Sequence, residues 1–302
     1  YNTKNKIIGK TINQYSLDEQ NGHLRIALYD NDGAKIAIFD ENLKQIGISN
    51  HVAKGEKMYS SRFMGNKAYL VTYKTVDPLF VIDLSNETKP TVLGELHIPG
   101  YSTYLHPYDE NHLIGIGMET EEIVNKNSIG KVTSTTSKIT GMKMALFDVS
   151  DVNNPTQLSQ TIIGDSRTTS AILTNPKALL FSKEKQLLAI PVNNYSEDFE
   201  IDSSIDSYSS IVDSYTNYNK SYVSEGYFVY KININDGFNL KGVITHETSQ
   251  KNKNKSSYSY NYNNSKLLRG LYIDNNLYTI SETAIKVNNL DTLELIDELK
   301  IK

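Results

Sequence analysis

Residues 58–117 read MYSSRFMGNKAYLVTYKTVDPLFVIDLSNETKPTVLGELHIPGYSTYLHPYDENHLIGIG, and this stretch decides the fold. Its first four apolar runs are short and rich in β-branched and aromatic residues, as strands are. Gly, Pro, Asn and Asp separate the runs, and these residues favour turns. The turn signals are Gly65-Asn66, Lys74–Asp77, Ser85–Pro90 and Pro99-Gly100. The stretch therefore predicts a four-stranded antiparallel meander.

The same pattern recurs along the chain, most clearly at the end of each third strand. The recurring positions are Asp40, Asp83, Asp148, Asn233 and Asn288. The first step is 43 residues, and two later steps approach the ~40–45 residues of a propeller blade once polar insertions are left out. The step from Asp148 to Asn233 fits less well. A lone meander cannot bury both faces, whereas blades stacked around an axis can. The sequence predicts an all-β propeller of five four-stranded antiparallel blade units.

The five units form one predicted domain over residues 1–302. Their expected bounds are 12–50, 58–98, 102–163, 175–246 and 267–302. The innermost strands are expected near 12–17, 58–64, 102–107, 175–181 and 267–273, and residues 4–10 are expected beside 292–301. Three polar insertions interrupt the units at 119–141, 193–225 and 248–266. Such tracts cannot form a core of their own, and the strand order predicts all three on one face.

Two sets of acidic or amide side chains have structural interpretations. At the five recurring positions, the side chain is expected to hydrogen-bond the backbone two residues on and close a turn. The run Asp30-Asn31-Asp32-Gly33 predicts a tight turn. It also resembles the start of a calcium loop, but the later ligands and the closing Glu are missing. A calcium site there is the weaker alternative, and no other cofactor is expected.

Composition excludes several function classes. A net charge of −4 with pI near 5.9 argues against a nucleic-acid partner. No apolar stretch approaches 18 residues, so no transmembrane segment is expected in this chain. The six His residues show no HExxH spacing, and GxSxG, Walker A and GxGxxG motifs are absent. The sequence therefore predicts no catalytic residue and no metal site.

Several motifs of the chain resemble those of a known protein family. They are SRFMG (61–65), VDPLFVIDL (76–84), GEL (94–96), IPG (98–100), YLHPYDENHLIGIG (104–117), NQYSLDE (13–19) and RGLY (269–272). These motifs resemble a bacterial family of secreted proteins with a C-terminal β-propeller domain, distantly WD40-like. The resemblance implies a secreted or cell-surface location and membership in a larger propeller. The chain departs from the family at Thr174-Asn175-Pro176, where an acid–histidine pair is expected.

Three functions compete on these grounds. The favoured one is a non-enzymatic binding module for an extracellular protein or glycan. A glycan-acting enzyme with paired carboxylates and a structural cell-envelope protein are the alternatives. Tyr, Ser and Asn in the insertions are typical of adaptable recognition loops. The candidate partner-binding residues are Tyr195, Tyr208, Tyr215, Tyr218, Tyr258, Tyr260 and Tyr262.

Four innermost strands carry a basic or potentially basic residue shortly before their first turn. These residues are Arg62, His106, Lys177 and Arg269. Innermost strands line the axis of a propeller, so equivalent positions would meet in a channel. Converging cations repel unless they are paired or matched to an anion. The sequence therefore predicts a channel site for an anionic ligand. The competing interpretation is that a neighbouring carboxylate or carbonyl neutralises each side chain.

Overall fold

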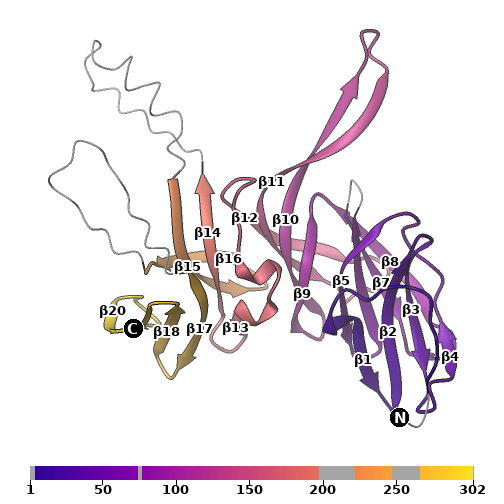
Figure 1. Cartoon of the computed structure of the whole chain (residues 1–302), viewed down its shortest axis with the longest axis horizontal. Helices are drawn as coiled ribbons and strands as arrows, with labels where there is room; N and C mark the ends of the chain where they lie inside the picture. Colours follow the sequence, from indigo (N-terminus) through magenta and orange to yellow (C-terminus); the bar gives the residue numbers. More distant parts are fainter. Residues whose placement is uncertain (1–3, 74–76, 197–221, 247–265, 302) are drawn as a thin grey trace. The chain divides into compact units, whose positions relative to one another are not determined.

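The computed structural model describes residues 4–73, 77–196, 222–246 and 266–301. Their strands form five four-stranded antiparallel sheets, each ordered as a simple meander (Figure 1). This confirms the predicted fold class. The helical segments in the described part are three short 3-10 turns, η1 (Gln14–Ser16), η2 (Ala171–Leu173) and η3 (Pro176–Ala178). None of them is long and apolar enough to cross a membrane.

The strands of the first three sheets follow the chain in order. Sheet 1 holds β1 (Leu17–Gln20), β2 (His23–Asp30), β3 (Gly33–Phe39) and β4 (Gln45–Ile48). Sheet 2 holds β5 (Lys57–Met64), β6 (Lys67–Tyr73), β7 (Asp77–Asp83) and β8 (Thr91–Ile98). Sheet 3 holds β9 (Tyr101–Asp109), β10 (His112–Lys126), β11 (Val132–Asp148) and β12 (Thr156–Ile163).

The last two sheets have the same topology. Sheet 4 holds β13 (Leu180–Ser182), β14 (Leu187–Ser196), β15 (Tyr222–Asn233) and β16 (Gly237–Ile244). Sheet 5 holds β17 (Leu267–Ile273), β18 (Asn276–Ser281), β19 (Ala284–Asn289) and β20 (Leu295–Lys300).

Two of the predicted first strands begin later than expected. The ranges 12–17 and 175–181 were expected to be strands, but each holds a 3-10 turn followed by a shorter strand. The cause is local capping. The side chain of Asn13 accepts a hydrogen bond from Tyr15 N, and that of Asn175 accepts one from Lys177 N. Each asparagine thus offers the backbone an alternative to a strand ladder.

The recurring turn-closing side chains are confirmed at four positions. Asp40 accepts from Asn42 N at 2.9 Å, and Asp83 accepts from Ser85 N at 2.9 Å. Asp148 and Asn233 do the same two residues on, at 2.8 and 2.9 Å. In sheet 5 the prediction is one residue off. Asn289, not Asn288, accepts from Asp291 N, because β19 extends one residue further.

The turn at Asp30–Gly33 is closed within the protein. Asp30 Oδ1 accepts from Asp32 N at 2.8 Å, and Oδ2 accepts from Lys35 Nζ at 2.7 Å. The hydrogen bond from Lys35 lowers the pKa of Asp30 to about 2. Gly33 has φ +118°, and a Cβ there would lie 2.1 Å from the Val52 carbonyl oxygen. These contacts close the predicted tight turn, and the calcium alternative stays a prediction.

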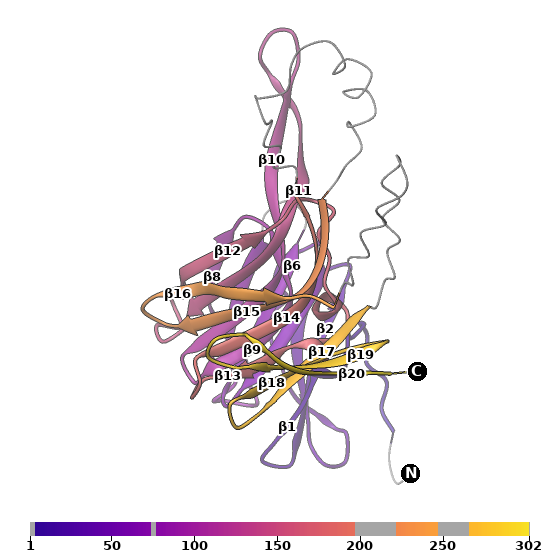
Figure 2. The same ribbon diagram turned by 90° about the vertical axis from the view of Figure 1, so that its left-hand side faces the viewer.

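The insertion at 119–141 is not a loose loop. β10 and β11 continue their pairing through it, from Glu119 opposite Gly141 to Lys126 opposite Val132. Figures 1 and 2 both show this hairpin extending beyond the rest of sheet 3. In sheet 4, β14 and β15 likewise pair from Asn193–Glu225 to Ser196–Tyr222. Both insertions connect second and third strands, as predicted.

The described chain divides into two compact units. Unit 1 holds residues 1–162 and 232–239, and unit 2 holds 163–231 and 240–302. Residues 164–176, with their 3-10 turn η2, lengthen the step from Asp148 to Asn233. The single domain over 1–302, its blade bounds and the shared face of the three insertions stay predictions. The third insertion, 248–266, lies almost wholly outside the described residues.

Apolar side chains from adjacent sheets form the cores. In unit 1, one cluster joins sheets 1 and 2, and a second joins sheets 2 and 3. The N-terminal segment covers the other face of sheet 1. Ile7 packs against Leu28, Ala37 and Phe39, and Lys10 pairs with Tyr29. The expected pairing of residues 4–10 with 292–301 would join both units, so it stays a prediction.

A buried histidine makes unit 2 sensitive to acid. His246 is 7% exposed; its Nδ1 lies 3.0 Å from Ser281 Oγ and its Nε2 lies 2.7 Å from Thr279 Oγ1. Burial, followed by the charge of Lys286, lowers the pKa of His246 to about 4. The unfolded chain, with an ordinary histidine pKa near 6.5, therefore binds the proton first.

We expect stability to fall as pH drops from about 6.5 to about 4, because the folded state must then hold a neutral imidazole while the unfolded state is protonated. The loss from His246 should be about 2 kcal/mol. Urea unfolding at pH 7 and pH 4.5 measures it, and His246→Gln should reduce the difference. An unchanged pH dependence in the variant would contradict the assignment.

Candidate ligand-binding site

The first strands of sheets 1 to 3 lie side by side in unit 1. β5 contacts η1, which precedes β1, and it contacts β9 on its other side. Small hydroxyl side chains join these segments. Ser16 Oγ lies 3.1 Å from Ser61 Oγ, and Ser60 Oγ donates to the Ser102 carbonyl at 2.7 Å. All four serines are buried. Their small size allows the three segments to approach closely.

Four larger side chains gather where these segments meet, and they are called the Arg62 cluster below: Tyr15, Arg62, Tyr104 and His106. The Arg62 guanidinium carbon lies 4.9 Å from the centre of the Tyr15 ring. The Tyr15 and Tyr104 rings are 5.4 Å apart. Tyr104 Oη lies 3.0 Å from His106 Nδ1. The structure thus brings together two of the four predicted channel residues, Arg62 and His106.

At neutral pH the charge in the Arg62 cluster is that of the Arg62 guanidinium. Burial, helped by the Arg62 charge, lowers the pKa of His106 to about 4. Burial raises the pKa of Tyr104 to about 12, although the nearby Arg62 opposes this. Both groups are therefore neutral at pH 7. Among the residues that the structure describes, no carboxylate pairs with Arg62. A guanidinium that lies over the Tyr15 ring and has no carboxylate partner in that part of the chain suits an anionic group.

The other two predicted channel residues belong to unit 2. Lys177 lies in η3 and Arg269 lies on β17, and both side chains are exposed. Neither makes an ion pair within the described ranges. Whether they share a channel with Arg62 and His106 stays a prediction.

Of the seven predicted partner-binding tyrosines, the structure describes Tyr195. Its backbone carbonyl accepts from Asp165 N at 2.7 Å, and its ring lies 5.6 Å from the Arg167 guanidinium carbon. The other six lie outside the described residues. They are Tyr208, Tyr215, Tyr218, Tyr258, Tyr260 and Tyr262. Their partner-binding role stays a prediction.

A second aromatic cluster, missed in the sequence, lies at the base of the β10–β11 hairpin. Tyr59, Tyr73 and Tyr101 pack with ring centres 4.6 to 5.8 Å apart. Tyr73 Oη donates to Ser137 Oγ on the hairpin. The sequence held a signal, because Tyr59 and Tyr101 each precede a serine in the first strands of consecutive blades.

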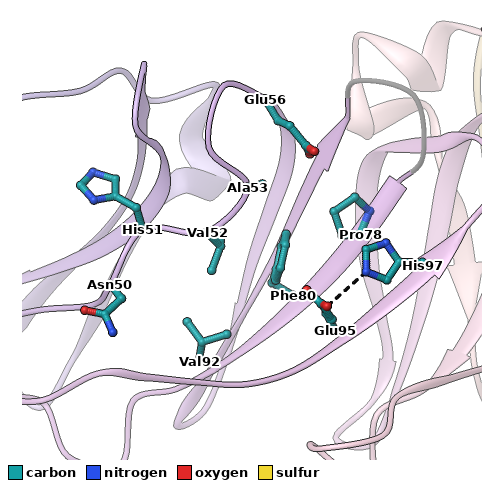
Figure 3. A pocket seen from close by; sticks show the side chains of 10 residues that line it. All are labelled: Asn50, His51, Val52, Ala53, Glu56, Pro78, Phe80, Val92, Glu95 and His97. Atoms are coloured by element: carbon teal, nitrogen blue, oxygen red, sulfur yellow. Dashed lines mark ion pairs between the residues drawn. The ribbon is translucent and has the colours of Figure 1, made fainter. Parts of the chain in front are cut away.

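Unit 1 also carries an open pocket of about 500 Å³ (Figure 3). The connection from sheet 1 to sheet 2 forms one side, and strands β7 and β8 form the other. Val52 and Phe80 supply apolar, buried side chains. His97 Nε2 lies 3.2 Å from Glu95 Oε1, and Thr72 donates to Glu56 at 2.6 Å. Because Glu56, Glu95 and His97 already have partners in the protein, this pocket is a weaker candidate than the Arg62 cluster.

Comparisons with known proteins agree with this architecture. The family model of the β-propeller domain matches residues 1–293. An uncharacterized protein of Methanocaldococcus jannaschii is 38% identical over 204 residues, which are 65% of this chain and 30% of that protein. An uncharacterized protein of Archaeoglobus fulgidus is 28% identical over 300 residues, 99% of this chain and 36% of that protein. The chain thus spans about a third of the length of these relatives.

The similarity of this chain to solved structures is weaker. BamB from Moraxella catarrhalis covers 95% of this chain and 75% of its own, with 9% identity and a TM-score of 0.35. The C-terminal WD40 domain of Sif2 covers 93% and 55%, with 9% identity and a TM-score of 0.41. Such scores say nothing of a ligand. The comparisons confirm the propeller part of the family resemblance. Both relatives are archaeal, so the secreted bacterial family stays a prediction.

Proposed function

Because the chain belongs to the β-propeller domain family, we propose that it is a non-enzymatic binding module, exported or displayed at the cell surface. Its ligand carries an anionic group that the Arg62 cluster holds. The observation that carries this proposal is the guanidinium of Arg62. It sits against the Tyr15 ring and has no carboxylate partner among the described residues.

The chemistry of the Arg62 cluster fits a carboxylate or a sulfate. Arg62 offers a fork of N–H donors, which matches two oxygens of such a group. The Tyr104 hydroxyl keeps its proton at pH 7, because its pKa is about 12. It can therefore donate to an anion or to the His106 imidazole. Partly buried donors bind charge more strongly than donors in water.

The same residues favour binding over catalysis. Glycoside hydrolysis ordinarily requires two carboxyl groups, one as an acid and one as a base or nucleophile. The Arg62 cluster contains none. An extracellular glycan or protein with acidic groups is the partner class that these donors match. The tyrosine-rich insertions are proposed as a second contact surface for the same partner.

Replacement of Arg62 by alanine should abolish most of the anion affinity. Losing a charge-assisted hydrogen bond costs about 1.5–3 kcal/mol, so affinity should fall at least about tenfold. Titration calorimetry with a sulfated and a carboxylated oligosaccharide measures it. The Arg62→Ala, Arg269→Ala double variant tests whether the second arginine contributes. Lys54→Ala is the control, because that lysine is 83% exposed and belongs to neither proposed contact surface.

The pH dependence of the anion affinity shows whether Arg62 or a histidine is the anion-binding group. His106 has a pKa of about 4, so affinity should stay level between pH 6 and pH 8. A rise in affinity near pH 6.5 would indicate an ordinary histidine as the anion-binding group. If neither oligosaccharide binds the unaltered protein, the anion proposal fails and a structural envelope role gains support.

A further inference from the structure

The connection between β7 and β8 carries an acceptor motif for N-linked glycosylation. Residues 86–88 read Asn-Glu-Thr, which matches Asn-x-Ser/Thr with a residue other than proline in the middle. A sugar chain on such an asparagine is bulky, so the acceptor must lie at the surface. Asn86 and Thr88 are both exposed. They also line a pocket of about 400 Å³ together with Asn21 and Asn66, so there is open space beside the asparagine.

The turn holds the Asn86 side chain by its oxygen and leaves its amide nitrogen available. Asn86 Oδ1 accepts from Thr88 N at 3.2 Å and from Thr88 Oγ1 at 2.8 Å. The backbone carbonyl of Asn86 accepts from Lys89 N at 2.9 Å. Within the described ranges, no hydrogen bond engages Asn86 Nδ2, which is the atom that would carry the sugar. The hydroxyl that the motif requires is thus already positioned on the asparagine.

The corresponding turn of sheet 3 shows that folding does not require this motif. There Asp151 takes the place of Asn86. Asp151 Oδ1 accepts from Asn153 N at 3.0 Å, and the backbone carbonyl of Asp151 accepts from Asn154 N at 3.1 Å. Closing the turn therefore accounts for Asn86 Oδ1, but it accounts neither for the amide nitrogen of Asn86 nor for the Thr88 hydroxyl.

A second match to the motif, Asn194-Tyr195-Ser196, lies in the opposite environment. Asn194 is part of β14, and its backbone pairs with Ser224 on β15. Asn194 Oδ1 is buried, and a Cβ added to Gly164 would lie 2.3 Å from it. An asparagine in a strand ladder with its side chain packed inward cannot enter the site of a transferase. The motif also occurs outside the described residues, at Asn219, Asn254 and Asn263.

We propose that Asn86 is an N-glycosylation site of this protein and that Asn194 is not. The proposal rests on the export proposed above, because the donor is an oligosaccharide linked to a polyprenyl phosphate or diphosphate outside the cytoplasm. Asn86 Nδ2 forms a bond to the anomeric carbon of the donor and loses one proton. The bond from that carbon to the phosphate oxygen breaks, and its electron pair leaves with the phosphate.

The test is peptide mass spectrometry on the protein from cells that naturally produce it, separated into surface and cytosolic fractions. The peptide with Asn86 should carry a glycan mass, and the peptide with Asn194 should have its unmodified mass. Thr88→Ser should keep the glycan, whereas Thr88→Val and Asn86→Asp should lose it. Asn86→Asp should keep the melting temperature of the unglycosylated protein, because Asp151 closes the same turn in sheet 3.

Location and modification are measured separately, so the two proposals fail in different ways. A surface protein with unmodified Asn86 would overturn the glycosylation and leave the export standing. A protein confined to the cytosol with unmodified Asn86 would overturn both. A glycan that persists on Asn86 in Thr88→Val would show that the motif is not what is recognised. A glycan on Asn194 would show that the folded structure does not select the acceptor. Either of these last two results would also overturn the proposal.

Discussion

Replacement of Lys143 by alanine is expected to destabilise unit 1 by about 3–5 kcal/mol, because it leaves a buried carboxylate without its counter-charge. The Lys143 side chain is 1% exposed, and its Nζ lies 3.0 Å from Glu119 Oε2. The same Nζ donates to the Pro99 carbonyl. Lys143 therefore ties the root of the β10–β11 hairpin to the connection before β9. Urea denaturation followed by tyrosine fluorescence measures the loss.

Two further variants make the Lys143 prediction specific. Lys138→Ala removes an exposed lysine from the same strand and should change stability by less than about 0.5 kcal/mol. The double variant Glu119→Leu, Lys143→Met removes both charges and should recover most of the loss, since an apolar pair of similar volume can replace a buried ion pair. A Lys143→Ala variant as stable as Lys138→Ala would show that the pair contributes nothing.

Arg25→Ala should have an effect of similar size on the contact between sheets 1 and 2. Arg25 is 2% exposed and donates through Nε to Asp18 at 2.7 Å. It also donates to the Gly65 carbonyl at 2.7 Å and lies 5.3 Å from the Phe63 ring centre. Its loss leaves Asp18 and that carbonyl without donors, so about 3–5 kcal/mol is expected.

Three variants distinguish the contribution of the Arg25 charge to stability from the contribution of its packing. Arg25→Met keeps the apolar stem and should retain part of the stability. Arg25→Lys keeps the charge but loses the fork that reaches both acceptors. Arg167→Ala breaks an exposed pair with Asp165 and should cost less than about 1 kcal/mol. If Arg25→Ala resembled Arg167→Ala, the buried contacts of Arg25 would be energetically unimportant.

The strands were predictable where turn residues bracket an apolar run. Sheet 2 follows this rule, because Gly65-Asn66 and Pro99-Gly100 mark its ends. The first strands of sheets 1 and 4 were misjudged because a single capping asparagine began a 3-10 turn. The hairpin at 119–141 was misjudged for a different reason. Its Thr- and Ser-rich run looked polar, yet threonine is β-branched and pairs readily in strands.

The candidate site was predictable only in part. Arg62 and His106 could be found because they occupy matching places in consecutive first strands. The partnership of Tyr15 and Tyr104 with Arg62 could not, because it depends on how neighbouring first strands are offset.

The hairpin of sheet 3 has a consequence for how a partner would meet this protein. The eight residues from Glu119 to Lys126 span about 25 Å at ~3.3 Å per residue. A loose insertion of that length would lose about 1–2 kcal/mol of backbone freedom per residue when a partner held it. Here the ladder has fixed the backbone before any encounter, so a partner at the tip meets a spacer of set length. Ile129 and Val132, which lie at the tip and are 83% and 51% exposed, could then contact a partner without the entropic cost of ordering the strands that carry them.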